Sequence, residues 1–291
     1  MEIKTYHIKQ YQNNLPVAVE IKTMQEIDEK LGGITDKPHR HNYYTIIWAT
    51  EATGKHIIDF KEYTIQSNYI FFVSPSQVHQ VITNHSPKGY VFLFTSDFLE
   101  MNSINKDFIS NINLFQNINE NPPLPIDEDK AKKLSLFAEE MLNAFREQKP
   151  MFLEIIGAYL KLFLIECNES CTIDKLVNTQ AVEVGRTLIK SFKLLVERNF
   201  KELHQVQEYA NVLNINPTYL NEVIKTNTNF SAKDYIQDRI ILEAKRLIIF
   251  SKKSAKEIGY ELGFEDPSHF SKFFKAHTST SIQEFKSSIE L

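Results

Sequence analysis

The sequence predicts an α+β protein with two parts, a β-rich N-terminal half and an all-helical C-terminal half. Roughly the first 120 residues contain short aromatic and β-branched runs that alternate with turn residues, a pattern typical of strands. Near the C-terminus a helix-turn-helix pattern occurs twice, at 206–225 and again at 255–275. Two apolar stripes of helical period lie between these regions.

The N-terminal strands are expected where Val, Ile, Phe, Tyr and Trp cluster between Gly, Asn, Ser and Pro. Several short strands at this spacing predict a β-barrel or a β-sandwich. The apolar runs that we interpret as strands lie at 43–49, 56–60, 69–73 and 90–94.

The region between the two halves is expected to form a pair of amphipathic helices. The proline-rich segment 121–125 breaks the β-pattern, and a helical pattern begins at Asp127. Pro150 separates the two helices. The predicted apolar faces consist of Leu134, Phe137, Met141, Leu142 and Phe145 in the first helix, and of Phe152, Ile155, Ile156, Tyr159, Leu162 and Phe163 in the second.

The two C-terminal copies align with each other, with one residue inserted in the second turn. Each copy has the pattern of a short helix, a tight turn and a second helix, and two such units in tandem indicate DNA binding. The matched pairs are Ala210 with Gly259, Leu213 with Leu262, Ile215 with Phe264, Pro217 with Pro267, Leu220 with Phe270 and Lys225 with Lys275.

The turns of both copies carry strong local signals. Asn216-Pro217 and Asp266-Pro267 each place an N-cap residue before a proline at the first helical position, so both second helices have a defined start. A capping box at 254–257 opens the first helix of the second copy. Gly259 and Gly263 suit a close helix crossing and a tight turn.

The outward faces of the second helices are candidates for DNA contact. Their apolar residues recur at helical spacing and should face the core, which leaves short or hydrogen-bonding side chains outside. Such side chains can reach base edges or phosphates, and the alternative is the solvated face of an ordinary helical hairpin. The predicted DNA-binding residues are Thr218, Asn221, Glu222 and Lys225 in the first copy and Ser268, His269, Ser271, Lys272 and Lys275 in the second.

Residues 180–291 resemble the AraC/XylS family of bacterial transcription regulators, on the basis of 258–264, 268–275 and a central helix at 235–247. The resemblance implies seven helices, with the central helix holding both helix-turn-helix units so that their second helices enter successive major-groove segments of DNA. The chain departs from the family pattern near its end, where Ser279 replaces an expected glycine, Ile282 an expected proline and Phe285-Lys286 an expected Tyr-Arg pair.

The segments 38–44 and 75–79 are similar to the cupin-type jelly-roll sensor that often precedes this DNA-binding domain. The resemblance implies an N-terminal cupin-like jelly-roll β-barrel that binds a small-molecule effector. Imidazole and aromatic side chains combine apolar faces with polar tips, as ligand cavities do. The candidate effector-binding residues are His39, His41, Tyr43, Trp48 and His79, and strand register decides which of them point inward.

The histidines also suggest a metal-dependent enzyme as an alternative. Three imidazoles can bind a transition-metal ion. A metal-binding cupin also supplies a glutamate shortly after the second histidine, where this chain has Thr45 and Ile46. We therefore predict no catalytic residue, no metal ligand and no cofactor, with a structural or effector-binding role for the histidines. A cupin enzyme with an accessory DNA-binding domain is the competing hypothesis.

The charge is divided unevenly along the chain. Residues 1–170 contain 16 Lys and Arg against 22 Asp and Glu, a net charge of −6, whereas residues 171–291 contain 17 against 15, a net charge of +2. Because +2 is weak for a DNA-binding domain, affinity should depend on where its lysines lie and should fall with salt. The chain shows neither an apolar signal region nor an uncharged apolar run of about 18 residues, which predicts a cytoplasmic protein without membrane contact.

These patterns predict an effector-sensing domain at 1–125, a helical pair at 126–168, a linker at 169–180 and an AraC-type DNA-binding domain at 181–291. The helical pair either dimerises the chain or packs on its own barrel. We expect a sequence-specific regulator, with activation the commoner role among relatives. Its expected partners are double-stranded DNA at two adjacent major-groove half-sites, a small-molecule effector, RNA polymerase and a second copy. An effector-independent regulator and an architectural DNA binder are further alternatives.

Overall fold

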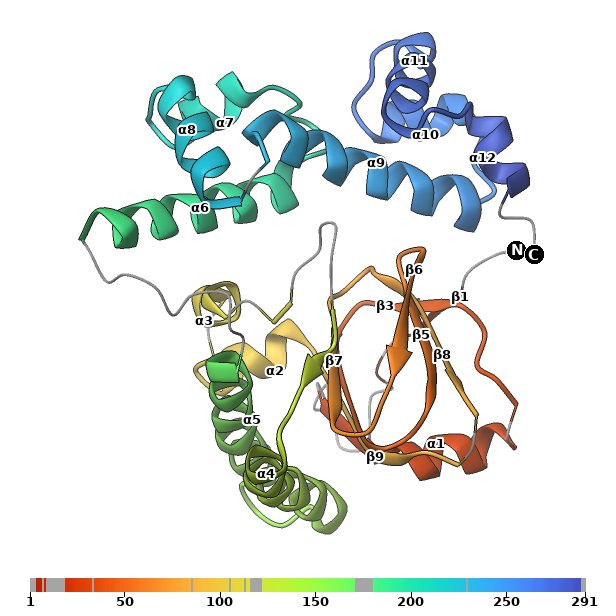
Figure 1. Ribbon diagram of the computed structural model, residues 1–291, viewed down its shortest axis with the longest axis vertical. Helices are drawn as coiled ribbons and strands as arrows, with labels where there is room; N and C mark the ends of the chain where they lie inside the picture. The colour runs from red at the N-terminus through yellow and green to blue at the C-terminus, as the bar shows by residue number, and fades with distance from the viewer. Residues whose placement is uncertain are drawn as a thin grey trace. The chain divides into compact units, whose positions relative to one another are not determined.

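The computed structural model describes residues 4–6, 8, 19–32, 34–84, 86–104, 106–112, 114–115, 122–170, 180–228 and 230–288. The chain divides into two compact units, one within 4–175 and one within 176–291. The first contains two β-sheets with helices, and the second is all helical (Figure 1). Of the helices that the structure describes, none combines the length and the apolar composition that crossing a membrane requires.

The strands that the structure describes in the N-terminal unit form two five-stranded sheets. Their bounds are β1 Lys4–Tyr6, β2 Val19–Thr23, β3 His39–His41, β4 Tyr44–Glu51, β5 Gly54–Ile58, β6 Lys61–Ile65, β7 Tyr69–Val73, β8 Val78–Thr83, β9 Lys88–Phe94 and β10 Leu124–Pro125. The first sheet has the order β1-β3-β8-β5-β6 and the second the order β10-β7-β4-β9-β2. All described pairs are antiparallel except β1 with β3.

The four predicted strands are present as β4, β5, β7 and β9, with ends that differ from the predicted ones by up to two residues. The run 56–60 stops at Ile58, because Asp59 and Phe60 have φ of 45° and 72° and form the tight turn into β6. Pro125 does not simply interrupt the β-pattern, since Leu124–Pro125 pairs with β7 at the edge of the second sheet, where a missing N–H is tolerated.

The described residues of this unit also form five helices: α1 Met24–Leu31, α2 Ser96–Met101, α3 Lys106–Asn111, α4 Glu128–Glu147 and α5 Phe152–Ser170. The predicted helical pair is α4 and α5, which pack against each other. Asp127 caps α4 by accepting a hydrogen bond from the Lys130 N–H at 2.8 Å. In α5 the predicted apolar face is partly wrong, because Ile155 and Leu162 are 40% and 46% exposed. The buried positions are Ile156, Gly157, Leu160, Phe163, Leu164 and Cys167.

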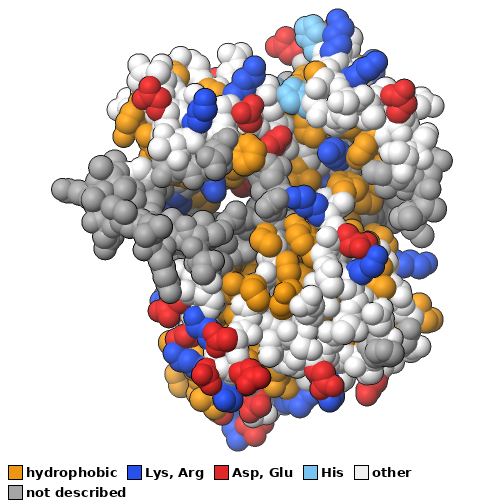
Figure 2. All heavy atoms as spheres, in the orientation of Figure 1, with side chains coloured by type: hydrophobic (Ala, Val, Ile, Leu, Met, Phe, Trp, Pro, Cys, Tyr) orange, Lys and Arg blue, Asp and Glu red, His pale blue; other side chains and the backbone are white. Residues whose placement is uncertain are grey.

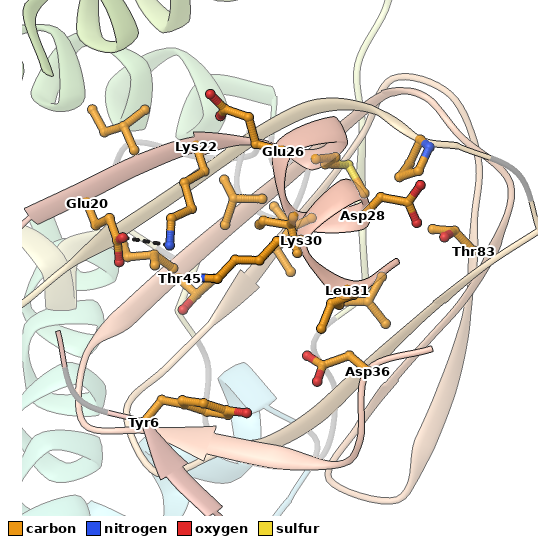
Figure 3. A pocket seen from close by; sticks show the side chains of 18 of the residues that line it. Tyr6, Glu20, Lys22, Glu26, Asp28, Lys30, Leu31, Asp36, Thr45 and Thr83 are labelled. Carbon is orange, nitrogen blue, oxygen red and sulfur yellow. Dashed lines mark ion pairs between the residues drawn. The ribbon is translucent and has the colours of Figure 1, made fainter. Parts of the chain in front are cut away.

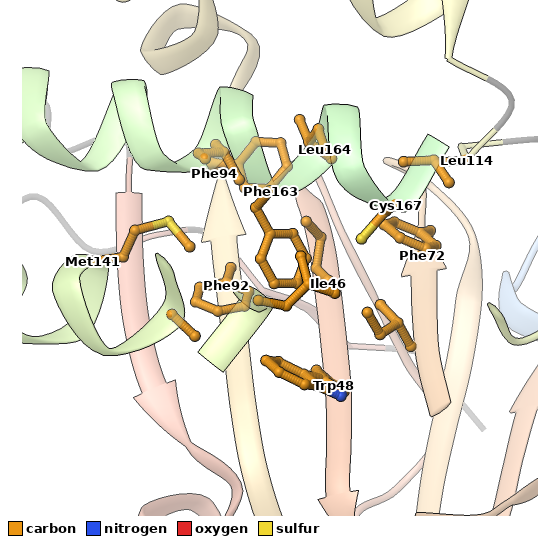
Figure 4. Packing of buried hydrophobic residues seen from close by; sticks show 14 of the residues in the cluster. Ile46, Trp48, Phe72, Phe92, Phe94, Leu114, Met141, Phe163, Leu164 and Cys167 are labelled. Carbon is orange, nitrogen blue, oxygen red and sulfur yellow. The ribbon is translucent and has the colours of Figure 1, made fainter. Parts of the chain in front are cut away.

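The second sheet has two apolar faces, because strand residues alternate between them. One face of β4 carries Ile46 and Trp48, which pack with Phe92 of β9 and Phe163 of α5 (Figure 4). The other face carries Ile47 and Ala49, which belong to a separate cluster shared with the first sheet. The sheet therefore separates a helix-covered core from an inner space between the two sheets.

The described residues of the C-terminal unit form seven helices, the number that the resemblance implies. They are α6 Gln180–Asn199, α7 Val206–Val212, α8 Pro217–Thr228, α9 Ala232–Phe250, α10 Ala255–Glu261, α11 Pro267–Thr278 and α12 Ile282–Ser288. The long helix α9 contacts both α7–α8 and α10–α11 (Figure 1). Most of the predicted linker, 171–179, lies outside the described residues, and its ends at 169–170 and 180 belong to α5 and α6.

A buried ion-pair network holds α9 in place. Arg239 of α9 bonds both carboxylate oxygens of Glu197 in α6, at 3.0 and 3.1 Å, and its guanidinium lies 3.8 Å from the ring centroid of Phe200. Glu243 bridges Arg239 and Arg246 at 3.1 and 3.2 Å. Both arginines are almost fully buried, so removing one partner would leave an uncompensated charge inside the unit.

Candidate DNA-binding surface and effector cavity

The turns of the two helix-turn-helix copies have the same backbone hydrogen bonds. In the first copy the N–H of Ile215 donates to the carbonyl of Ala210 at 3.0 Å, and in the second the N–H of Phe264 donates to the carbonyl of Gly259 at 3.0 Å. The residue before each of these donors, Asn214 or Gly263, has a left-handed φ of 54° or 82°. The repeat in the sequence is therefore a repeat in the backbone.

The predicted caps are confirmed in both copies. Asn216 accepts a hydrogen bond from the Thr218 N–H and Asp266 accepts one from the Ser268 N–H, each at 2.7 Å. Helices α8 and α11 begin at the prolines that follow these caps. The capping box at 254–257 is also present, with reciprocal bonds between its first and last residues.

The second helices bury their apolar residues and expose polar ones. Leu220 and Ile224 of α8 and Phe270 and Phe274 of α11 are buried in one core. The exposed members of the predicted DNA-binding set are Thr218, Glu222, Lys225, Ser268, His269, Ser271, Lys272 and Lys275. Figure 2 shows Lys or Arg and His side chains gathered over the α10–α11 end of this unit.

Asn221 differs from the other predicted DNA-binding residues. It is half-buried, and its side-chain oxygen accepts a hydrogen bond from the Ala232 N–H at 3.0 Å. This bond satisfies one of the free donors at the N-terminus of α9 and ties α8 to the central helix. Its counterpart Ser271 is exposed and donates to the Pro267 carbonyl of its own helix at 3.0 Å.

Tyr219 is a surface residue that the sequence analysis missed. It follows Thr218 in the first turn of α8 and is 45% exposed, and it was not among the predicted DNA-binding residues. The repeat contains the signal that would have identified it, because Tyr219 aligns with His269 of the second copy.

The N-terminal unit contains a cavity of about 980 Å³. Its lining includes apolar side chains such as Ile47, Val91 and Leu93. Charged side chains from β2, α1 and the segment after α1 also line it, with an ion pair between Glu20 and Lys22 at 2.6 Å (Figure 3). The cavity thus offers both an apolar wall and ionic groups to a ligand.

Four of the five candidate effector-binding residues line this cavity, namely His39, His41, Tyr43 and His79. Trp48 does not, and its prediction as a cavity residue is wrong. Odd-numbered β4 positions such as Thr45 and Ile47 face the cavity, so the even-numbered Trp48 points to the opposite face. There its ring lies 5.9 Å from the ring of Phe163.

The three histidines gather on the inner face of the first sheet. His39 is the direct cross-strand partner of His79, and His41 is two residues further along β3 on the same face. One nitrogen from each ring lies within 4.8 Å of the others. The Nε2 atoms of His41 and His79 are 3.4 Å apart, and the ring of Tyr43 stacks on His41 at 4.4 Å.

A fourth histidine, His56 on β5, contacts the nitrogen of His79 that faces away from His41. Its Nε2 is 2.9 Å from Nδ1 of His79, and the residue is fully buried. The sequence did not reveal this neighbour, because the pairing of β5 with β8 is a register that no local signal specifies.

Burial keeps the imidazoles of His41, His56 and His79 neutral. It lowers the pKa of His41 to about 3 and that of His56 to about 3, and it lowers the pKa of His79 well below the usual range. Neighbouring histidine charges act in the same direction. Near pH 7 each of these three rings therefore carries one N–H and one lone pair. Burial also raises the pKa of Tyr43, whose hydroxyl stays protonated.

Comparisons with known proteins find similarity to helix-turn-helix transcription regulators. Residues 209–288 match the family model described as a helix-turn-helix domain. The uncharacterized HTH-type transcriptional regulator YfiF of Bacillus subtilis (strain 168) is 21% identical over 258 residues, which cover 86% of this chain and 78% of YfiF. The HTH-type transcriptional activator RhaS of Enterobacter sp. (strain 638) is 20% identical over 264 residues, which cover 89% of this chain and 91% of RhaS.

Among solved structures, unsaturated fatty acid bound wild-type ToxT from Vibrio cholerae strain SCE256 is 15% identical to this chain. The similarity covers 95% of this chain and 96% of ToxT, with a TM-score of 0.43.

Proposed function

We propose how this protein, which belongs to the AraC/XylS family of helix-turn-helix transcription regulators, binds and regulates its promoters. Helices α8 and α11 enter two successive major-groove segments of DNA. A small molecule that enters the N-terminal cavity alters this binding. The protein is a regulator and not an enzyme. The observation that carries the proposal is the repeated turn, because both copies have the same hydrogen bonds and caps and both pack on α9. At about 1.5 Å per residue α9 is about 28 Å long, comparable with the roughly 34 Å between such groove segments.

The exposed polar residues of α8 and α11 have different proposed roles. Lys225, Lys272 and Lys275 are long cations suited to phosphate oxygens. Thr218, Ser268, His269, Ser271 and Glu222 are suited to base edges or to positioning contacts. Asn221 is assigned to the junction between α8 and α9, because its oxygen already bonds Ala232.

The proposed effector site is the cavity lined by His39, His41, Tyr43 and His79. The two five-stranded sheets around it support a cupin-like jelly-roll barrel as the sensor fold. A ligand can regulate DNA binding only if it binds one arrangement of the protein better than another. The cavity is large enough for a small organic molecule or for a bound ion with further ligands.

A homodimer is proposed to form through the outer faces of α4 and α5. Leu136, Ile155, Leu162 and Ile165 are 37% to 56% exposed there, although they are large apolar residues. Exposed apolar area of this kind favours association with another surface. The name of the RhaS relatives, transcriptional activators, supports activation as the mode of regulation. Contact with RNA polymerase in the cytoplasm is part of the proposal. We also propose that the effector-sensing domain ends at 125, the helical pair at 168 and the linker at 180.

The experiment that tests DNA recognition is selection of full-length protein against random duplex DNA at near-physiological salt. The retained pool should contain two short motifs whose centres lie about ten base pairs apart. The selection is run once without additions and once with the small-molecule fraction of a cell lysate. If neither run enriches a sequence, sequence-specific regulation is contradicted. Enrichment of a single motif would contradict tandem readout by both helices.

A further inference from the structure

We propose that His39, His41 and His79 form a binding site for a divalent transition-metal ion, so that the sensor cavity responds to a metal or to a metal-bound small molecule. This inference rests on the proposal that the cavity is the effector site. The missing glutamate argues against the metal site of an enzyme, but the structure brings the three imidazoles together without it. Imidazole nitrogen is a preferred ligand of zinc, copper, nickel and iron.

The spacing of the ring nitrogens fits a tetrahedral ion. Zinc bonds imidazole nitrogen at about 2.1 Å, so two nitrogens at tetrahedral positions lie about 3.4 Å apart. The Nε2 atoms of His41 and His79 are separated by 3.4 Å, and the nitrogen of His39 completes a set that fits within 4.8 Å. A small rotation of the His39 ring would bring the third nitrogen to the same spacing, and the pairing of β3 with β8 keeps all three residues close together.

The opposite nitrogen of each ring already has a partner. Nδ1 of His39 is 2.8 Å from the Lys37 carbonyl and 3.1 Å from the Asp36 carboxylate. Both partners only accept, so Nδ1 carries the proton and Nε2 keeps its lone pair for the cluster. Nδ1 of His41 is 3.2 Å from the Thr45 hydroxyl. Metal-binding histidines are oriented by such contacts on the nitrogen that faces away from the ion.

His56 completes this arrangement as a positioning residue for His79. If Nδ1 of His79 donates to Nε2 of His56 across their 2.9 Å contact, Nε2 of His79 presents a lone pair to the cluster. If Nδ1 of His41 likewise donates to the Thr45 hydroxyl, the lone pairs of His41 and His79 face each other at 3.4 Å, an arrangement that a cation between them stabilises. The three ligands line the cavity, so its water or an oxygen of an organic effector would complete the coordination.

The test is titration of tag-free, chelator-stripped full-length protein with Co²⁺, followed by displacement with Zn²⁺. We expect one equivalent to bind with the visible absorption of tetrahedral cobalt, and Zn²⁺ to abolish that absorption. His41→Asn and His79→Asn should each weaken binding at least about 100-fold, whereas His277→Ala, a histidine of the helical unit, should bind like the parent. Thermal melting identifies any variant that fails to fold. Absence of stoichiometric cobalt binding by the parent protein would overturn the proposal.

Two variants at His56 separate positioning from simple packing. His56→Gln keeps an acceptor for His79 and should retain near-parental affinity for cobalt, while His56→Phe removes the acceptor and should weaken it by about 10-fold to 100-fold. Equal affinities for the two variants would contradict the positioning role. The same samples are assayed on the selected DNA. Protein that binds this DNA selectively but binds no metal refutes the metal site alone and leaves the regulator assignment intact.

Discussion

The two helix-turn-helix copies share a backbone but present different chemistry to DNA. Glu222 in α8 occupies the position of Lys272 in α11, and Tyr219 occupies that of His269. Thr218 and Lys225 have close counterparts in Ser268 and Lys275. Counting ionised groups at these aligned positions, the first helix is neutral and the second carries two positive charges. Phosphate affinity should therefore come mainly from the second copy, and the first should contribute mainly to base recognition.

The copies also differ in how they are joined to the rest of the unit. The turn of the second copy lies against the carbonyl oxygen of Lys201, and its turn residue is Gly263. The first copy places Asn214 at the same left-handed position. In the first copy, the tie to the central helix is the bond from Ala232 to Asn221. The same fold is thus stabilised by different residues, so matched substitutions should have unequal effects.

The largest expected effect is that of Gly263→Ala. A Cβ at this position would lie 1.9 Å from the Lys201 carbonyl oxygen, on a backbone with φ of 82°. We expect the free energy of unfolding to fall by more than about 3 kcal/mol, and DNA binding to be lost with it. Urea denaturation of the full chain measures this change. The matched variant Asn214→Gly should stay within about 1 kcal/mol of the parent, and equal losses would contradict the comparison.

Asn221→Ala should reduce stability and leave DNA specificity unchanged. It removes the acceptor of the Ala232 N–H at the start of α9, a loss of about 1 to 2 kcal/mol. Its counterpart Ser271→Ala removes only a bond within one helix and should cost less than about 0.5 kcal/mol. Urea denaturation of both variants measures the loss of stability, and selection against random duplex DNA measures their base preferences. A relaxed base preference without loss of stability would mean that Asn221 reads DNA.

Lys272→Ala should weaken DNA binding by about 1 kcal/mol. It should also reduce the slope of log affinity against log salt concentration by about one, because one fewer phosphate is neutralised. Lys132→Ala in α4 serves as a lysine control in the other unit. Replacing Glu222 with lysine gives the first copy the charge of the second and should tighten binding to all sequences. Fluorescence anisotropy at several salt concentrations measures these effects. If Lys272→Ala binds like the parent at every salt concentration, the second copy does not supply the phosphate contacts.

The smallest expected effect is that of Ser279→Gly at the end of α11. Ser279 has φ of 61° and caps the helix by donating its N–H to the Lys275 carbonyl at 2.9 Å. Glycine adopts this conformation without strain, so stability should rise by about 0.5 kcal/mol with unchanged DNA affinity. A thermal melt is sufficient to test it, and a lowered melting temperature would show that the serine side chain stabilises the cap.

How far the sequence predicts the molecule depends on the range of the interactions involved. The caps at Asn216 and Asp266 act on residues two positions away, so the starts of α8 and α11 could be predicted. The contact of Asn221 with Ala232 depends on where α9 packs, and no local pattern reveals it. Trp48 shows that the sheets have a similar limit. Strand alternation decides which face its side chain points to, but the local sequence does not specify the strand register.

The His cluster lies between these two cases. His39 and His41 alternate along one strand, so their common face could be predicted once β3 is recognised. His79 joins them because β8 pairs with β3, and His56 joins them because β8 also pairs with β5. The paired residues are up to 40 positions apart along the chain. The chemistry of the site was visible in the sequence, but its assembly required the sheet.

The central claim is that α9 holds both second helices at a fixed spacing on one face of DNA. The most direct test is the affinity of the full-length protein for its selected site after insertion of five base pairs, about half a helical turn, between the two motifs. We expect affinity to fall to that of a single motif, by about 100-fold or more. Insertion of a full turn should not restore it, because α9 cannot lengthen. Unchanged affinity after the half-turn insertion would contradict the claim.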